Sequence, residues 1–285
     1  HSAAVQIMNK SLLLFVFLPS VAFAWGGRGH EVVCEIAFQE LNSVARNEVE
    51  RLIEIDTGFG SFTESCRWAD QLEERAPDHY MNVPRELSAI TKDGCPLAET
   101  CLLSAIKKDA EILSDKSQSD QARLAALKSL GHWIGDLHQP LHISFQDDRG
   151  ANYIDVAGSC RGSLHGVWDG CILERQVGKD VAAIANDFLG SITEDDRRSW
   201  LTDATIEWAN ESYQITLSPD TGYCTMKDDG CWYWPYFRTL KEGNMQREMI
   251  ITQDYLSANQ KIVELRLKQA GVRLGALLNG MLEDQ

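Results

Sequence analysis

The stretch Gln121–Leu137, QARLAALKSLGHWIGDL, decides the fold class of this chain. Its apolar residues recur at helical spacing and form one stripe: Leu124, Leu127, Leu130 and Ile134. Pro140 then ends or kinks the helix, because proline lacks an N–H donor and clashes with the preceding turn. The stretch therefore predicts a long amphipathic helix with one side buried against other elements.

The same periodicity recurs before and after this stretch. It predicts further helices at His30–Leu41, Val44–Ile55, Leu102–Leu113, Asp180–Leu189, Ser199–Leu217 and Asn259–Met281. Ser43 is a good cap residue for the second of these. The strand signal is weak, and Asn152–Val156 is a candidate for a short hairpin arm. We therefore expect one all-α, mainly helical domain with long loops.

The composition fits a globular protein with a real core. Of 285 residues, 44% are hydrophobic and 24% are charged, which makes disordered, collagen and coiled-coil classes unlikely. The net charge of −15 argues against a protein that grips duplex DNA through a broad basic surface. The negative charge does not exclude a nucleic acid substrate, because metal ions could supply positive charge locally to bind its phosphates.

The first 24 residues are read as upstream sequence, His1–Ile7, followed by a secretory signal peptide. They contain a start with a short basic region, an apolar run and an A-x-A cleavage signature, at Met8–Lys10, Ser11–Ala22 and Ala22–Ala24. The apolar run is too short for a membrane span, and Pro19 interrupts it. Cleavage after Ala24 leaves Trp25 at the N-terminus of a single domain, 25–285, that is secreted or periplasmic and has no membrane partner. An uncleaved lipid-surface anchor is the alternative.

Cysteine usage agrees with export. The chain has eight cysteines: Cys34, Cys66, Cys95, Cys101, Cys160, Cys171, Cys224 and Cys231. None falls in a C-x-x-C zinc pattern, and an even number behind a signal peptide favours disulfides that staple the domain. Short loops favour Cys160–Cys171, and Cys34–Cys66 would tie the first helices together. The pairing of the other four stays open.

Histidines and aspartates provide the functional signal. His132 and Asp136 are four residues apart in H-W-I-G-D, and His165 and Asp169 repeat that spacing in H-G-V-W-D. On a helix, each pair projects from one face. Imidazole nitrogen and carboxylate oxygen are the donors that zinc takes in proteins. A single such pair is more often a surface pair or a capped core histidine, but two pairs together favour a metal site.

Four more residues extend the candidate metal set. His142 follows directly after the break at Pro140, and His30 lies five residues after Trp25. Asp70 and His79 share the segment W-A-D-Q-L-E-E-R-A-P-D-H-Y. The two H-x-x-x-D pairs with His30 and His142 could hold more than one ion, whereas His138, in L-H-Q-P-L-H, is the histidine that best fits a purely structural role.

An ordered set of motifs resembles the S1/P1 nuclease family, which are secreted, zinc-dependent single-strand nucleases and 3′-nucleotidases. The motifs are W-G-x-x-G-H at Trp25–His30, W-A-D at Trp68–Asp70, H-Y-M-N at His79–Asn82, G-H-W-I-G-D-L-H-Q-P-L-H at Gly131–His142, D-R-G-A-N at Asp148–Asn152 and H-x-x-W-D at His165–Asp169. The stretch Ala270–Asn279 is also similar to the family's last helix. The resemblance covers essentially all of the chain after the signal peptide and implies the helical fold shared by these nucleases and zinc phospholipases C.

The resemblance implies three zinc ions at the bottom of a cleft. It assigns to the first ion Asp70, His79, His132 and Asp136. It assigns to the second ion His30, the shared Asp136, and the α-amino and carbonyl groups of Trp25. It assigns to the third ion His142, His165 and Asp169, and it makes Asp70 and Asp136 the catalytic carboxylates. A free amine can donate a lone pair to zinc and an amide cannot, so signal cleavage is expected to complete the second ligand set.

The activity that the resemblance implies is hydrolysis of single-stranded DNA and RNA to 5′-phosphate products, together with hydrolysis of 3′-mononucleotides. A zinc-activated bridging hydroxide would be the nucleophile. Tyr80 could stack on a base, with Asn152 and Asn82 bonding its edge, although a core role for Tyr80 is an equal alternative. The aromatic stretch Tyr223–Phe237 fits a disulfide-held cap better than a second stacking patch. No obligate protein partner is expected.

The chain departs from the family pattern at two positions. Glu73 stands where the family often has an arginine that binds phosphoryl oxygens; Arg75 or Arg67 could serve instead. Ser163 stands where asparagine is frequent. These changes could alter rate or substrate preference without removing a metal ligand.

Two other functions stay open at the level of sequence. The first is a trizinc phospholipase C, against which speak the short gap from Trp25 to His30 and the use of Asp169 where those lipases tend to use glutamate. The second is a non-catalytic secreted domain whose metals only stabilise the fold.

Overall fold

A computed structural model describes residues 25–91, 94–202, 204–227, 230–232 and 247–283. The expected signal peptide lies outside the described residues, as do residues 228–229 and 233–237 of the aromatic stretch Tyr223–Phe237. The α-helices are α1 Gly26–Gln39, α2 Ser43–Ile53, α3 Phe62–Ser65, α4 Leu102–Ser114, α5 Asp120–His138, α6 Leu164–Gly166, α7 Val181–Ser191, α8 Glu194–Trp200, α9 Thr205–Leu217 and α10 Gln253–Leu282. Shorter 3₁₀ or π-helical turns are η1 Trp68–Gln71, η2 Glu73–His79, η3 Pro140–His142, η4 Val167–Cys171, η5 Leu173–Val177 and η6 Pro219–Thr221. The mainly helical, disulfide-bonded fold is confirmed.

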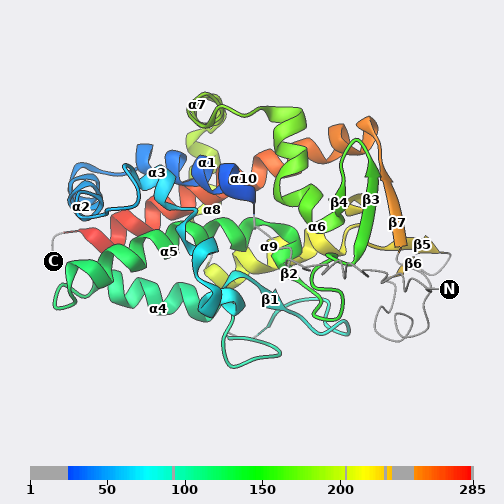
Figure 1. Cartoon of the computed structure of the whole chain (residues 1–285), viewed down its shortest axis with the longest axis horizontal. Coiled ribbons are helices and arrows are strands. Elements are labelled where there is room, and N and C mark those ends of the chain that lie inside the picture. Colours follow the sequence, from blue (N-terminus) through cyan, green and yellow to red (C-terminus); the bar gives the residue numbers. More distant parts are fainter. Residues whose placement is uncertain (1–24, 92–93, 203, 228–229, 233–246, 284–285) are drawn as a thin grey trace, which may run out of the picture.

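Helix α5 lies at the centre of the molecule. Ser119 caps its start, where its side chain accepts a hydrogen bond from the Ala122 amide, and the helix ends at His138, just before Pro140. The expected helix over this stretch is therefore confirmed. Every residue from Leu130 to His138 is buried, because α1, α4, α9 and α10 pack around this half of α5 (Figure 1). The polar side chains of the H-W-I-G-D motif are thus held inside the protein.

Helix α10 runs along the length of the molecule and packs closely against α1 (Figure 1). Two glycines permit this approach. A Cβ atom at Gly271 would lie 2.5 Å from the side chain of Ile36, and one at Gly275 would lie 3.1 Å from the carbonyl oxygen of Ala37. The small residues of the C-terminal motif therefore set the position of α1.

Two expected elements differ in the structure. The range expected as one helix, Ser199–Leu217, instead contains the end of α8 and the whole of α9. The carbonyl of Trp200 accepts a hydrogen bond from the buried Arg273 of α10 at 3.0 Å, and α8 ends there. The cap of α2 is Asn42, which accepts a hydrogen bond from the Ala45 amide at 2.9 Å, and Ser43 is already inside the helix.

The described strands form three small sheets. The strands are β1 Met81–Asn82, β2 Ile143–Ser144, β3 Ile154–Gly158, β4 Gly162–Ser163, β5 Thr225–Lys227, β6 Gly230–Trp232 and β7 Arg247–Ile251. The hairpin arm expected at Asn152–Val156 is found, slightly shifted, as the antiparallel pair β3–β4. The parallel partner β7 gave no signal in the sequence. The parallel pair β1–β2 joins the segment after His79 to the segment after His142.

Four disulfides are present in the described residues. Cys34–Cys66 and Cys160–Cys171 were expected, and Cys95–Cys101 and Cys224–Cys231 are local pairs.

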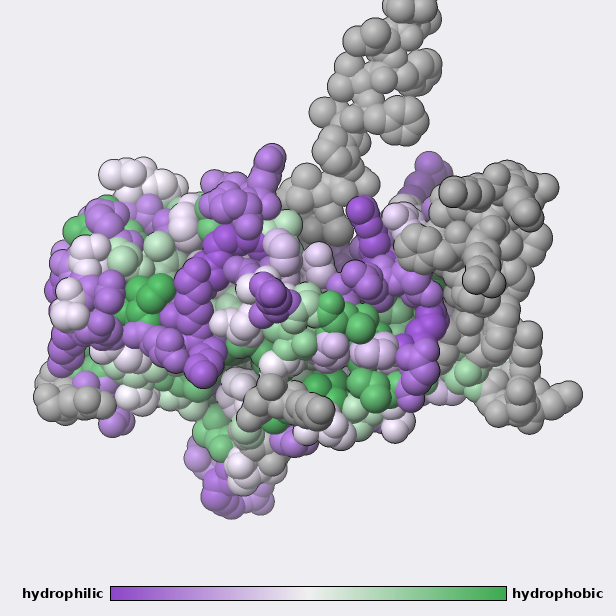
Figure 2. Space-filling view, turned by 90° about the horizontal axis from the view of Figure 1, so that it is seen from below, coloured by the Kyte–Doolittle hydropathy of each residue, from purple (hydrophilic) through white to green (hydrophobic). Residues whose placement is uncertain are grey.

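None of the helices in the described ranges combines the length and apolar character that a bilayer span requires. On the α4 side, hydrophilic residues are spread among smaller hydrophobic areas (Figure 2).

Candidate metal centre

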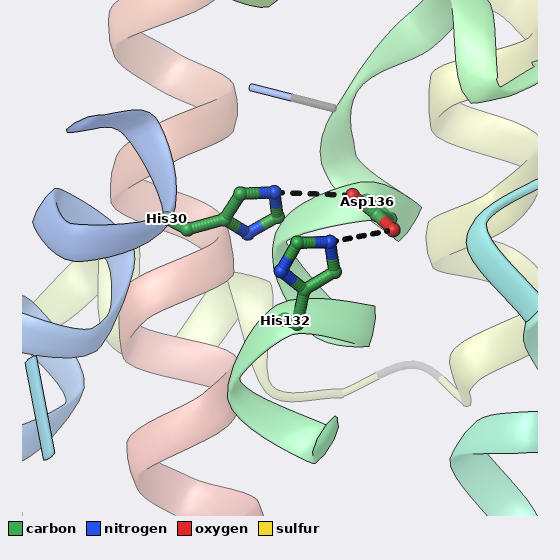
Figure 3. A group of neighbouring side chains, drawn as sticks. All are labelled: His30, His132 and Asp136. Atoms are coloured by element: carbon green, nitrogen blue, oxygen red, sulfur yellow. Dashed lines mark ion pairs between the residues drawn. The ribbon is translucent and has the colours of Figure 1, made fainter. Parts of the chain in front are cut away.

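The centre is built around Asp136, which is fully buried in α5. His132 lies one helical turn earlier, and its Nε2 atom is 3.4 Å from Asp136 Oδ2. His30 comes from α1 on the other side, and its Nε2 atom is 3.3 Å from Asp136 Oδ1 (Figure 3). The two carboxylate oxygens of Asp136 therefore face imidazoles from two different helices.

A second group comes from the turns η1 and η2. His79 Nδ1 is 3.1 Å from Asp136 Oδ2 and 3.1 Å from His132 Nε2. Asp70 Oδ1 is 3.5 Å from His132 Nε2. Asp70 and His79 thus gather around His132 Nε2, and His79 also faces the oxygen of Asp136 that His132 faces.

A third group lies beside the other two and comes from η3, α6 and η4. His165 Nε2 is 3.2 Å from His142 Nε2 and 3.6 Å from Asp169 Oδ1. His142 Nε2 is 3.8 Å from the same oxygen of Asp169. His142 also approaches Asp136 Oδ1 with its Nδ1 atom at 3.9 Å, so this group adjoins the first.

The donor spacings fit a bound metal. Tetrahedral ligands at zinc–donor distances near 2 Å lie about 3.3 Å from one another. Both ring nitrogens of His30 and Oδ1 of Asp136 are buried and make no hydrogen bond among the described residues. Unpaired buried polar atoms are costly, and a cation bound between them would remove that cost. The described residues thus form three groups that could each hold a metal ion.

Backbone carbonyls orient three of the imidazoles. The Nδ1–H groups of His132 and His165 donate to the carbonyl oxygens of Cys66 and Gly150, both at 2.7 Å. His142 Nδ1–H donates to the carbonyl of His79 at 2.5 Å. Each bond fixes the tautomer that leaves the Nε2 lone pair directed at the cluster. These oxygens have no sequence signal, because any residue type supplies a carbonyl.

Burial shifts the pKa values of several side chains in the centre. It raises the pKa of Asp136 to about 7 and that of Asp70 to about 6, and it lowers the pKa of His165 to about 4. The imidazole of His165 is therefore neutral at physiological pH, which is its ligand form. The same burial disfavours ionised carboxylates, and a bound cation would stabilise their charged form.

A glycine and a tryptophan position His30. A Cβ atom at Gly135 would lie 2.5 Å from His30 Nδ1, so only glycine leaves room for the imidazole beside α5. The Trp25 side chain is fully buried, and its indole N–H donates to the Gly135 carbonyl at 2.7 Å. The second glycine of the G-H-W-I-G-D motif thus contacts both Trp25, the N-cap residue of α1, and His30 inside α1.

The predicted base-binding residues lie in three different environments. Tyr80 is 40% exposed, which argues against a core role. Asn82 is half-buried in β1. Asn152 is held by its own surroundings, because its Nδ2–H donates to the Arg149 carbonyl at 2.8 Å and its Oδ1 accepts from the Ser163 hydroxyl at 3.2 Å. Base recognition by these residues stays a prediction.

The two arginines considered as replacements at the Glu73 position differ in their contacts. Arg75 donates to Asp109 at 2.8 Å and to Asp78 at 2.7 Å, and its guanidinium lies 4.9 Å from the Trp133 ring centroid. These bonds commit Arg75 to the support of the turn that carries His79. Arg67 is half exposed, forms a long ion pair with Glu31 at 3.6 Å, and places its guanidinium 5.8 Å from the centroid of the Phe59 ring.

The fold and the site together define a class of protein. Buried imidazoles and carboxylates converge from α1, α5 and five short elements, η1, η2, η3, α6 and η4, inside a disulfide-bonded helical domain. Neutral nitrogen donors, carboxylate oxygens and an exposed aromatic side chain next to a ligand are typical of a metal-dependent hydrolase.

Comparison with known proteins identifies the family. The model of the S1/P1 Nuclease family matches residues 25–283, and the chain belongs to this family. Endonuclease 2 of Arabidopsis thaliana is 31% identical over 96% of this chain and 96% of its own length. Nuclease S1 of Aspergillus oryzae is 25% identical over 92% of this chain and 93% of its own length. The protein is thus a nuclease, a hydrolase that acts on phosphodiester bonds, in a family of zinc-dependent enzymes.

Proposed function

We propose that this chain is a zinc-dependent endonuclease of single-stranded DNA and RNA that releases 5′-phosphate products and also hydrolyses 3′-mononucleotides. The placement of Asp136 is the main support. One of its oxygens faces His30 and the other faces His79 and His132, so a single carboxylate can bridge two ions. Paired metals of this kind serve phosphodiester hydrolysis in many enzymes.

The proposed ligands are those that the family resemblance assigns. Three zinc ions would be held by Trp25, His30, Asp70, His79, His132, Asp136, His142, His165 and Asp169. Bound zinc supplies positive charge toward the phosphate and activates water for attack. Burial keeps the pKa of four proposed ligands below the ordinary histidine value: His79, His132, His142 and His165. These imidazoles are therefore neutral and do not add to the charge of the site. The local charge therefore stays positive although the whole chain is acidic.

Substrate selection is proposed to begin at Tyr80. Its ring is exposed directly beside the ligand His79 and could stack on an unpaired base. Asn82 and Asn152 would bond the edge of that base. The Ser163 hydroxyl donates a hydrogen bond to Asn152 Oδ1 and accepts one from the Gly166 amide at 3.1 Å. Ser163 therefore positions this asparagine and also caps α6.

Export and processing are part of the proposal. A signal peptide removed after Ala24 would leave the domain 25–285 with a free α-amine on Trp25, in a secreted or periplasmic enzyme. The apolar run and the A-x-A signature before Trp25 support this assignment. We infer no obligate protein partner.

The test is an assay of the purified, processed protein with its zinc content measured by elemental analysis. We expect about three zinc ions per chain, and hydrolysis of single-stranded RNA, single-stranded DNA and 3′-AMP that stops on chelation. Duplex DNA of the same sequence should be cleaved much more slowly. Release of the headgroup from phosphatidylcholine without cleavage of nucleic acid would favour the phospholipase alternative, and a zinc-loaded protein inactive on every substrate would favour a structural role for the metals.

A further inference from the structure

A pocket near the metal-binding turn η1 has no role in the chemistry above. It is a pocket of about 320 Å³, large enough for a small heterocycle. The residues that matter for its character are Asp56, Phe59, Trp68, Gln71, Gln121 and Lys128. We call it the Phe59 pocket.

The Phe59 pocket adjoins the ligand-bearing elements. Trp68 and Gln71 belong to η1 and flank the ligand Asp70 in the sequence. Lys128 lies on α5 four residues before His132, hence on the same face and about 6 Å away along the helix axis. When a strand is bound at the metals, the base of a neighbouring nucleotide can therefore reach this pocket.

The walls of the pocket are aromatic. The Lys128 ammonium lies 4.1 Å from the centroid of the Trp68 ring and 5.5 Å from that of the Phe59 ring. The guanidinium of Arg67 lies 5.8 Å from the Phe59 ring. Both rings are half-buried, so part of each stays accessible. Alternating cations and aromatic rings are typical of surfaces that bind single-stranded nucleic acid.

The charge of the pocket selects among possible ligands. Lys128 is buried, and its ammonium is paired with Asp56 at 2.8 Å, which cancels the charge at the pocket floor. A phosphate would find no unpaired cation there, whereas a neutral ring system would find stacking surfaces. The exposed amides of Gln71 and Gln121 make no side-chain hydrogen bond in the part of the chain that the structure describes. They are available to bond the edge of a heterocycle.

We propose that the Phe59 pocket binds an unpaired base of the substrate strand, from a nucleotide next to the one whose phosphate is cleaved. This inference rests on the proposed function. A base inside a duplex is stacked and paired and cannot enter, so the pocket adds to the preference for single strands. A 3′-mononucleotide has a single base, on the same sugar as the reacting phosphate. It has no neighbouring nucleotide whose base could enter the pocket.

The experiment compares Phe59→Leu with Phe59→Tyr, which keeps the ring, on two substrates. For a single-stranded decanucleotide, we expect Phe59→Leu to raise KM about tenfold, because the base loses the aromatic ring on which it stacks. KM for 3′-AMP, kcat and zinc content should stay at the wild-type values. Phe59→Tyr should behave like the wild type, as should Leu201→Ala, a truncation of an exposed apolar residue outside the pocket.

Oligonucleotides with one abasic site at successive positions locate the bound base. In the wild type, one position beside the cleaved bond should raise KM when its base is missing, and that increase should disappear in Phe59→Leu. An unchanged decanucleotide KM in Phe59→Leu, or equal increases for decanucleotide and 3′-AMP, overturns the inference. Failure of the wild type to hydrolyse either substrate would instead overturn the proposed function.

Discussion

At the scale of single residues, the partners of each histidine separate structural from functional roles. His138 donates from Nδ1 to the Ile134 carbonyl at 2.8 Å, and its Nε2 contacts Arg273 at 2.9 Å, so both ring nitrogens are satisfied. His132, six residues earlier, has only Nδ1 bonded to a backbone carbonyl, and its Nε2 faces carboxylates. The prediction that His138 is structural is confirmed, although spacing alone could not prove it.

Replacement of the shared carboxylate tests the metal assignment. Asp136→Ala should lose more than one zinc ion, because its two oxygens face different ligand groups. Activity on single-stranded RNA should fall more than about a hundredfold, since even an outer-shell partner of a metal costs about 10- to 100-fold in affinity. Elemental analysis and an RNA hydrolysis assay measure both quantities.

The matched control for that change is Asp187→Ala, which removes an exposed aspartate of α7. It should leave zinc content and activity unchanged. An Asp136→Ala protein that keeps all its zinc and full activity would refute the bridging role.

At the scale of elements, the contact between α1 and α10 links stability to the site. Gly271→Ala should reduce the free energy of unfolding by about 1–3 kcal/mol, because the new methyl group overlaps Ile36 and forces α1 away. Gly280→Ala is the control, since it lies in the same helix with nothing within 4 Å of the added Cβ. It should be neutral or slightly stabilising. Equal loss of stability in both variants, measured by chemical denaturation, would contradict the packing argument.

The contact between α9 and α10 depends on one acid. Glu211 Oε1 accepts from Arg273 at 2.7 Å, and Glu211 Oε2 accepts from Arg266 at 2.5 Å, with both arginines buried. Partial burial alone would raise the pKa of Glu211, but these bonds and charges outweigh burial and lower it. The stabilisation is therefore complete above the ordinary glutamate pKa and is lost as the pH falls through the lowered one.

Glu211→Gln should consequently destabilise the protein by about 3 kcal/mol at neutral pH, because it leaves two buried cations without a counter-charge. Denaturation measured from neutral to acidic pH should show less loss of stability in the variant than in the wild type. The same acid dependence in both proteins would mean that other carboxylates dominate.

Sequence patterns predicted the long elements and missed the short ones for physical reasons. Helices such as α5 have an apolar stripe and clear end signals, so they were found nearly to the residue. The break between α8 and α9 depends on a bond from Arg273, far away in the sequence, which no local pattern contains. Strand β7 pairs with β3 across a long separation and was missed for the same reason.

At the scale of the whole molecule, the site is a product of long-range convergence. Residues from 30 to 169 meet around Asp136, and only the two H-x-x-x-D pairs were visible from spacing alone. The assignment of Asp70 and His79 to the same site came from the family resemblance, and their approach depends on the turns η1 and η2. The carbonyls that orient the imidazoles could be located only in three dimensions.

The proposed N-terminal ligand ties export of the whole chain to its chemistry. Trp25 is buried at the start of α1 with its indole bonded to Gly135, which fixes the backbone of residue 25 beside the helix that carries Asp136. One extra residue before Trp25 would turn the α-amine into an amide, which has no lone pair to give to zinc. We expect such a protein to fold, to contain about one zinc ion less and to lose most of its nuclease activity. One extra residue after Gln285 is the control and should change neither quantity, whereas full zinc and activity in the N-terminally extended protein would exclude the amine as a ligand.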